Sequence, residues 1–424
     1  MKPRDQTNFE WRNSGFQNVK LLLKLIAEKR HVSDGKVSFS GSNYQYWLPV
    51  LNTAVVAHDR VGALKPRCVE AAISDPSVSL EDDPSKFLEA CNAAFNRLQQ
   101  RPNTEFIVYS SLTYDGPPLF DAIEDGDVKI EWLPAKADNN FLHKANDARK
   151  ELSHIMSGRK VVRDVSSLST LLAYVPARDA REAFERAIDS VDRLRGMLNL
   201  LINSSRGLHA FHDLMAPHAM NKFRRGQYQT VHNPDGSLAA EMFWYEPGWY
   251  HDAEGVTFSD PSNYRDALQK FWERYQLNPL RALLSDCFTR YCRALDSHEF
   301  ETSLIRLWSV LEELTGSENG LVVVDRIRKL FKDDLEAAMV AEHIRIRRNS
   351  NVHQAITPGS REQDAILVQL NTLVSQILFF CLKEGGSKIQ NVQELIAFLG
   401  FSIDEAWLTR QQALMEFFSS YRNR

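Results

Sequence analysis

Cysteine is scarce in this chain. Only five of the 424 residues are cysteines, an odd number, and they are scattered without closely spaced pairs. This pattern provides neither a disulfide framework nor the ligand spacing of a zinc site. We therefore expect a protein of the reducing cytoplasm that holds no metal and needs no cofactor.

Long apolar runs are also missing. No stretch approaches the roughly 18 uninterrupted apolar residues of a membrane-spanning helix. Residues 1–8 are polar and lack the apolar segment of an export signal. The sequence therefore predicts neither a membrane span nor secretion.

Neither charge dominates, and two common catalytic motifs are absent. The chain has 51 Lys and Arg against 55 Asp and Glu, a net charge of -4. Because this gives no global basic field, any binding of nucleic acid must be local. The lack of a Gly-rich phosphate loop and of a G-x-S-x-G motif argues against a P-loop enzyme and an α/β-hydrolase.

Residues 1–158 mix helical and strand patterns, which predicts a first α/β domain in a chain long enough for two or three domains. Residues 35–49 are aromatic and rich in Ser and Gly, as strands and turns are. The spacing of apolar residues predicts helices over 18–30 and 84–99, and the polar segment 139–158 is expected to form a further, linking helix. It predicts strands over 104–112 and 128–133.

Residues 159–260 form a second expected α+β region. A long amphipathic pattern predicts a helix over 179–203. The N-P-D-G sequence at 233–236 is a strong turn signal. It predicts a hairpin whose strands are 228–231 and 238–245.

Residues 261–424 show helical periodicity throughout, in segments of about 15 to 20 residues. The expected fold class is therefore α+β, with a mixed α/β N-terminal region followed by an all-helical C-terminal bundle. We expect the boundary between them near Pro261.

One predicted helix of this last region carries an acidic residue on its apolar stripe. Over 303–314 the apolar stripe includes Leu304 and Trp308, and Glu312 continues it in steps of four. Burying an unpaired carboxylate costs several kcal/mol, so Glu312 should have a cationic or hydrogen-bonded partner. Arg348 and His353 are the candidate partners of Glu312, because their side chains have the required chemistry.

Residues 345–353 read R-I-R-R-N-S-N-V-H and concentrate guanidinium, amide and imidazole groups. This combination suits a phosphodiester. In a helix, Asn349 and His353 share a face, whereas Arg348 and His353 diverge by roughly 140°. Either the length of the arginine or a local helix distortion can bring the two together.

Residues 348–353 match the R-N-x-x-x-H form of the R-x(4–6)-H signature, and the chain here resembles the HEPN ribonuclease superfamily. The L-W-S-V-L-E-E-L sequence at 307–314 looks like the helix that precedes the motif in the Apea-like branch. An apolar helix over 365–382 follows in the right order. The resemblance covers about 262–390, and 171–203 looks more weakly like the α+β region upstream.

The resemblance implies a metal-independent endoribonuclease that acts as a homodimer, often a toxin or an anti-phage effector. His353 would be the acid-base group and Arg348 would stabilise charge on the phosphoryl oxygens. Asn349 would orient His353 or the phosphate, and Glu312 would hold Arg348 or tune the imidazole. RNA is the implied substrate, as tRNA, rRNA or mRNA.

Other basic residues are expected to contact the RNA. Arg345 and Arg347 lie within the motif, and Arg347 also satisfies the signature, which leaves open which arginine faces the cleft. Arg328 and Lys329 belong to a basic run just upstream. The plain alternative for all of these is a solvated basic face or a helix cap.

Two other readings stay open. The bundle could be a catalytically silent HEPN module that binds a nucleotide, RNA or a partner protein, or a purely structural dimerisation domain. Glu312 could serve a structural ion pair as well as a catalytic one. Residues 1–260 would sense a trigger, for example a phage product, or restrain the nuclease.

Two further clusters point more weakly to function. His209, His212 and His218 lack the spacing of a complete metal site, so we favour ordinary surface histidines. The aromatic residues 243–245, with Trp249 and Tyr250, could stack on bases. Packing of a hairpin on a helix explains the same residues, and we favour that interpretation.

Overall fold

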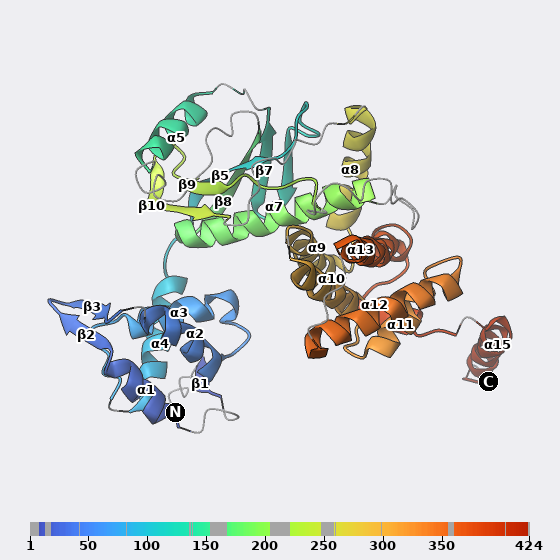
Figure 1. The fold of residues 1–424 in the computed structure, drawn as a ribbon, viewed down its shortest axis with the longest axis horizontal. Coiled ribbons are helices and arrows are strands. Elements are labelled where there is room, and N and C mark those ends of the chain that lie inside the picture. Colours follow the sequence, from blue (N-terminus) through green and yellow to red (C-terminus); the bar gives the residue numbers. More distant parts are fainter. Residues whose placement is uncertain are drawn as a thin grey trace. The chain divides into compact units, whose positions relative to one another are not determined.

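The structure is a computed structural model that divides into two compact units, Met1–Asn103 and Thr104–Arg424 (Figure 1). The described residues are 8–12, 18–41, 43–81, 83–134, 137, 139–152, 168–203, 221–246, 258, 260–297, 299–354, 360–402 and 404–422.

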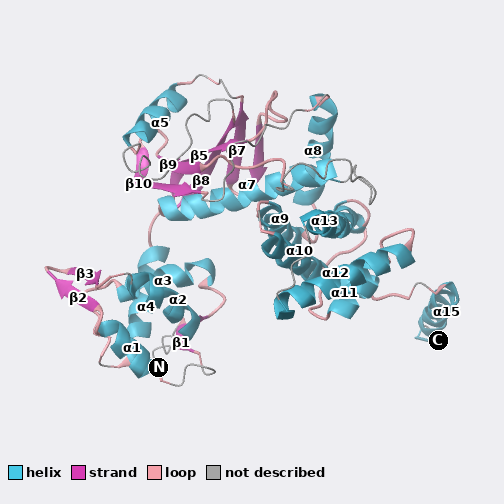
Figure 2. Cartoon of the chain, in the orientation of Figure 1, coloured by secondary structure: helices cyan, strands magenta, loops and turns pink. Residues whose placement is uncertain are grey.

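The first unit is a small helical domain with two short antiparallel strand pairs (Figure 2). Its buried core includes Phe9, Ile26, Phe87 and Phe95. The helices are α1 (Val19–Ala27), α2 (Asn43–Ala54), α3 (Lys65–Ile73), α4 (Pro84–Gln99) and the short η1 (Gly62–Leu64). The strand pairs are β1 (Phe9–Trp11) with β4 (Val55–Ala57), and β2 (Arg30–Ser33) with β3 (Lys36–Phe39).

The expectation of strands and turns throughout 35–49 was only partly right. Strand β3 is present, but helix α2 begins at Asn43 and contains Pro49. Tyr44, Trp47 and Leu51 recur at helical spacing and pack against the core of this unit. Their burial outweighs the helix-breaking tendency of the proline.

The second unit contains a six-stranded antiparallel sheet in the order β10-β9-β5-β8-β7-β6. The strands are β5 (Thr104–Leu112), β6 (Ala122–Asp125), β7 (Val128–Leu133), β8 (Ser169–Ala177), β9 (Tyr228–His232) and β10 (Leu238–Tyr245). The longest pairing joins β5 to β8, with Phe106 opposite Val175. The predicted strands and hairpin are confirmed, and β6 is an additional edge strand.

Helices cover both faces of this sheet (Figure 1). Helix α7 (Ala180–Asn203) packs on β5 and β8, and α5 (Asn140–Glu151) buries Leu142 against Ile107 and Leu172. Because successive residues of a strand point to opposite faces of the sheet, Ile107 packs against α5, whereas Phe106 and Val108 lie in the main core. Helix α7 also packs against α9 (Arg281–Leu295), so the sheet and the bundle share one core.

These contacts differ from the expected division into the domains 1–158, 159–260 and 261–424. The sheet combines strands 104–133 with strands 169–245, so the expected boundary near residue 158 lies inside one sheet. The observed division falls between Asn103 and Thr104. Pro261 does begin helix α8 (Pro261–Gln276), but no separate unit begins there.

All the secondary structure described after Pro261 is helical, as predicted. The sheet region followed by a helical region makes the fold α+β. The remaining helices are α10 (Phe300–Thr315), α11 (Gly320–Arg328), α12 (Asp334–Gln354), α13 (Ser360–Leu382), α14 (Val392–Leu399), α15 (Glu405–Arg422) and the short η2 (Gly385–Ser387). Side chains of Asp260, Asn319 and Asn391 cap α8, α11 and α14.

Helix α13 is the one described helix that is long and apolar enough to cross a membrane. The candidate span covers 26 residues, Glu362–Ser387, and includes most of α13, but 61% of its most apolar window is buried within the protein. Leu370, Val374 and Ile377 lie in the main core. This burial is that of a central helix in a bundle.

His232 on β9 is buried in its neutral form. Its Nδ1 lies 2.9 Å from the carbonyl oxygen of Gly236, so Nδ1 carries the proton. Its Nε2 then accepts from the hydroxyl of Thr230 at 2.8 Å. Burial, helped by the charge of Arg149, lowers the pKa of His232 from 6.5 to about 4.

Acid should therefore destabilise the second unit through His232. Because the pKa of His232 is lower in the folded protein than in the unfolded chain, the contribution of neutral His232 to the free energy of unfolding is fully present above pH 6.5. It is lost as the pH falls towards 4. The loss should reach roughly 3 kcal/mol in free energy of unfolding. Urea unfolding at several pH values should show a shallower pH dependence for His232→Asn than for the wild type. Equal slopes would contradict the assignment.

Candidate active site

Helix α10 carries Glu312 at the edge of its buried face. Leu304, Trp308 and Leu311 are fully buried, and Glu312 lies one turn beyond Trp308. Its side chain is only 18% exposed. The indole Nε1 of Trp308 donates to Glu312 Oε1 at 2.8 Å, which fixes the carboxylate on the helix surface.

Helix α12 presents Arg348 where its buried stripe would continue. Ala337, Ala341 and Ile344 are buried at helical spacing, and Arg348 follows Ile344 by four residues. Its side chain is 33% exposed. An always-charged group thus occupies a position that packing would otherwise fill with an apolar residue.

Arg348 and Glu312 form the contact that joins the two helices. Arg348 Nη2 donates to Glu312 Oε1 at 3.4 Å, and Arg348 Nη1 donates to Asn349 Oδ1 at 3.1 Å. The first distance is long, so this is an ion pair with a weak hydrogen bond. The buried Nε of Arg348 has no hydrogen-bond partner among the described residues. The predicted cationic partner of Glu312 is confirmed.

Arg345 is held within its own helix. Its Nε and Nη2 donate to Glu342 at 2.7 and 2.6 Å, and this pairing raises the pKa of Arg345 and lowers that of Glu342. Its stem crosses the start of α11, where a Cβ on Gly320 would lie 2.8 Å from Arg345 Cδ and 3.7 Å from Trp308 Cζ2. Glycine at position 320 therefore provides the space for Arg345.

Arg347 pairs with Glu362 of α13. Of the three arginines in the motif, Arg348 is thus the one that ion-pairs with α10. Arg345 and Arg347 flank it, each bound to its own carboxylate.

His353 lies on α12, which continues unbroken from Asp334 to Gln354, but its side chain is outside the described part of the structure. A local distortion near the motif is therefore not present. Regular helical geometry directs Arg348 and His353 roughly 140° apart and places Asn349 on the side of His353.

The outer face of α12 carries three exposed apolar side chains, with Glu342 between them, on the side of His353. Leu335, Met339 and Ile346 are 69%, 68% and 50% exposed. They precede His353 by 18, 14 and 7 residues, so all four positions lie within roughly 40° of one another around the helix. The exposed apolar stripe and His353 therefore share the face opposite Arg348.

Arg328 and Lys329 do not join this cluster. Arg328 pairs with Asp325 and with Asp334 at 2.6 Å, while Lys329 pairs with Asp325 and donates to the carbonyl of Leu399 at 3.1 Å. Asp334 begins α12, about 21 Å from Arg348 along the helix axis. These two basic residues tie α11 to α12 and α14, and they lie far from the motif.

The structure describes only part of the histidine and aromatic clusters. His209, His212, His218, Trp249 and Tyr250 lie outside the described residues. In the described ranges, no group of three or more His, Cys, Asp or Glu residues is arranged to hold a metal ion. On β10, the ring of Trp244 stacks on that of Phe184 from α7 with centroids 3.9 Å apart, which confirms the packing interpretation for this residue.

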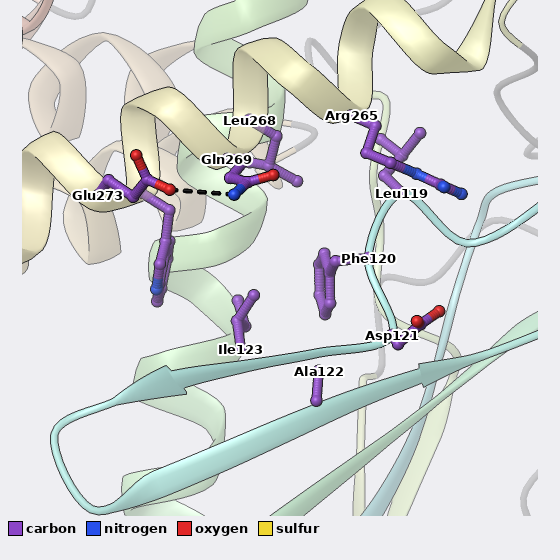
Figure 3. A pocket seen from close by; sticks show the side chains of 10 residues that line it. Leu119, Phe120, Asp121, Ala122, Ile123, Arg265, Leu268, Gln269 and Glu273 are labelled. Atoms are coloured by element: carbon purple, nitrogen blue, oxygen red, sulfur yellow. Dashed lines mark hydrogen bonds between the residues drawn. The ribbon is translucent and has the colours of Figure 1, made fainter.

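A pocket of about 440 Å³ lies elsewhere, between α8 and the edge strand β6 (Figure 3). Phe120, Ile123 and Leu268 point into it, and Gln269 donates to Glu273 at 3.0 Å at its rim. Sequence reasoning missed this pocket because its walls come from segments about 145 residues apart, neither of which carries a motif.

Comparisons with known proteins return no match to any family model, curated protein or solved structure. The likeness to HEPN ribonucleases therefore rests on the residues of α10 and α12. Chemically, these helices offer an anchored guanidinium beside an amide, on a helix that also carries an imidazole. Such a set can bind an anionic phosphate and transfer a proton.

Replacing Glu312 should test the contact between α10 and α12. Glu312→Ala leaves the charge of Arg348 half-buried and removes the acceptor of Trp308, so it should lower the free energy of unfolding by about 1–2 kcal/mol. Glu313→Ala is the matched control, because Glu313 is largely exposed and only 3.8 Å from Arg290 at best. Urea unfolding that shows equal losses for the two variants would contradict this role of Glu312.

Proposed function

We propose that α10 and α12 form the active site of a metal-independent endoribonuclease of the HEPN type. The observation that carries the proposal is the ion pair between Arg348 and Glu312, beside Asn349, on the helix that also bears His353. The motif and its acidic partner come from separate helices, and the fold brings them into contact.

Arg348 binds a non-bridging oxygen of the scissile phosphate in this proposal. Glu312 holds the guanidinium in place, so less side-chain entropy is lost when the phosphate binds. Charge that builds on the phosphoryl oxygens in the transition state is stabilised by a cation at a partly buried position. Arg345 and Arg347 flank it and add positive potential for the RNA backbone.

His353 moves the protons. It takes the proton of the ribose 2′-OH while the 2′ oxygen forms a bond to phosphorus. The bond from phosphorus to the 5′ oxygen breaks, and the His353 of a second protomer protonates that leaving oxygen. The products are a 2′,3′-cyclic phosphate and a free 5′-OH, with no water or metal consumed.

A homodimer fits the positions of these residues on α12. Arg348 and His353 occupy positions roughly 140° apart on one unbroken helix, and the proposed reaction uses two copies of His353, of which each α12 carries one. The exposed stripe of Leu335, Met339 and Ile346 lies on the side of His353 and supports burial of this face against a partner. Two protomers would then supply both imidazoles.

A toxin or anti-phage effector in the cytoplasm is the natural setting, by analogy with the family. Single-stranded loops of tRNA, rRNA or mRNA would enter such a cleft. A nuclease that attacks its own host must be restrained, and the N-terminal part of the chain is proposed to sense the trigger. Deletion of 1–103 tests this better than deletion of 1–260, which would expose the face of α9 that packs on α7.

The second candidate is a catalytically silent module that binds a nucleotide, RNA or a partner protein. The observation that favours it is the saturation of the arginines: Arg345 and Arg347 are ion-paired, and Arg348 contacts Glu312. Such a site would bind an anion when the arginines exchange their carboxylate partners for it. An imidazole would have no role in this binding.

Substitution of His353 separates the two candidates. His353→Ala should reduce RNA cleavage at least about 100-fold, because general acid-base catalysis is lost, while RNA binding persists. His343→Ala is the control, since His343 is the other histidine of α12. Sequencing of RNA ends from cells expressing each variant gives the readout. Unchanged cleavage by His353→Ala would exclude His353 as the acid-base group.

The chemistry of cleavage gives a separate test. A chelator should leave the rate unchanged, because no metal activates the nucleophile. A substrate with a single 2′-deoxy residue 5′ of the cleavage site should resist cleavage, because the attacking oxygen is gone. Inhibition by the chelator, or cleavage of the 2′-deoxy substrate, would contradict the mechanism.

A further inference from the structure

Arg348 is held less tightly than its neighbour Arg345. The guanidinium of Arg345 donates to both carboxylate oxygens of Glu342, at 2.7 and 2.6 Å. Arg348 Nη2 instead reaches Oε1 of Glu312 at 3.4 Å, well beyond the roughly 2.7–2.9 Å of a strong charge-assisted hydrogen bond. The carboxylate of Glu312 differs in that a second donor shares the oxygen that Arg348 contacts.

This second donor is the indole of Trp308. Its Nε1 donates to Glu312 Oε1 at 2.8 Å. Trp308 is 1% exposed and lies in the main core, so its indole cannot follow a moving carboxylate. The shorter bond to the fixed indole therefore sets the position of the carboxylate, and Arg348 pairs with it at the longer distance.

Arg348 consequently keeps hydrogen-bonding capacity for a further partner. A guanidinium carries N–H groups on each of its nitrogens and has no acceptor. Nη1 of Arg348 donates to Asn349 Oδ1 at 3.1 Å, Nη2 has the long contact with Glu312, and the buried Nε has no partner among the described residues. Because the side chain is 33% exposed, an anion from solvent can reach the guanidinium.

The weak pairing favours exchange of Glu312 for a phosphate. Phosphate oxygens form short, charge-assisted hydrogen bonds with a guanidinium, and here they replace a single contact of 3.4 Å. A carboxylate that could turn freely would close on Arg348 as Glu342 closes on Arg345, and phosphate would then compete with a bidentate pair. The hydrogen bond from Trp308 prevents this closure.

We propose that Trp308 is a positioning residue for an anion site at Arg348. By holding the carboxylate of Glu312, the indole keeps the guanidinium near its partner but available to a phosphate group. Trp308 acts through Glu312 and does not touch the anion. This role rests on the proposed function only in that an anion binds at Arg348, which the nuclease and the silent module both require, and His353 has no part in it.

The affinity of the full chain for inorganic phosphate tests this role. It is measured from the rise in melting temperature with phosphate concentration at constant ionic strength. Trp308→Phe keeps an aromatic ring in the core but removes the N–H donor, so Glu312 can close on Arg348. Phosphate affinity should fall roughly 10-fold, because phosphate must then displace a stronger charged hydrogen bond. Arg348→Ala gives the background from non-specific stabilisation.

Trp132→Phe is the matched control. Trp132 is also 1% exposed in the main core, but its Nε1 has no partner among the described residues. The same change of ring there removes packing without removing a hydrogen bond. It should lower the melting temperature and leave phosphate affinity at the wild-type level. Equal losses of affinity in the two variants would show that core damage weakens binding, and would overturn the proposed role of Trp308.

A second substitution separates positioning of the carboxylate from damage to the core. In the double variant Trp308→Phe with Glu312→Gln, the neutral amide cannot form a charged pair with Arg348. Phosphate affinity should therefore return to the wild-type level or rise above it, whereas a merely structural role of Trp308 gives no rescue. Unchanged affinity in Trp308→Phe, or a double variant as weak as the single one, would contradict the role of Trp308.

The test of His353 distinguishes failure of this role from failure of the proposed nuclease. If His353→Ala cleaves RNA like the wild type while the phosphate affinities change as expected, the nuclease mechanism fails and the role of Trp308 stands. If His353→Ala abolishes cleavage but Trp308→Phe binds phosphate like the wild type, the role of Trp308 alone fails. A wild type that gains no more stability from phosphate than Arg348→Ala would reject the anion site itself.

Discussion

A buried ion network between α7 and α9 is the constraint on which the arrangement of the second unit depends. Arg195 and Asp192 are almost completely buried and lie 2.6 Å apart, and Arg195 also reaches Asp296 at 2.6 Å. Burial alone would raise the pKa of Asp192, but Arg225, Arg195 and Arg293 hold it below its usual value. Loss of one member would leave a buried charge uncompensated, which fixes α7 against α9 in one register.

This network makes α7 the shared element of sheet and bundle. One side of α7 covers β5 and β8, and its other side carries α9, which in turn packs on α10. The site on α10 and α12 is therefore connected to the sheet by a continuous series of packed helices. A change in the sheet region can reach Glu312 only by moving these helices, and their shared core resists such movement.

Local patterns predicted much of this. The strand Val128–Leu133 was predicted from its alternating apolar residues and Thr104–Leu112 from a continuous apolar run, and the stripe around Trp308 implied that Glu312 needed a partner. Helix α2 was missed because Pro49 and the nearby glycines resemble a turn, while tertiary burial of the aromatic residues decides the outcome. The boundary expected near residue 158 failed because strand pairing is non-local.

The sequence by itself determined helices such as α4 and α7, the strands β5, β7, β9 and β10, the all-helical last region, and the residue types gathered at 345–353, because these depend on patterns along the chain. Only the tertiary structure decided which partner each charge has. Arg348 faces Glu312, Arg347 faces Glu362, and Arg328 with Lys329 binds elsewhere. Equivalent guanidinium groups are indistinguishable in a sequence, since their roles depend on which helix face they occupy and which carboxylate the fold brings within reach.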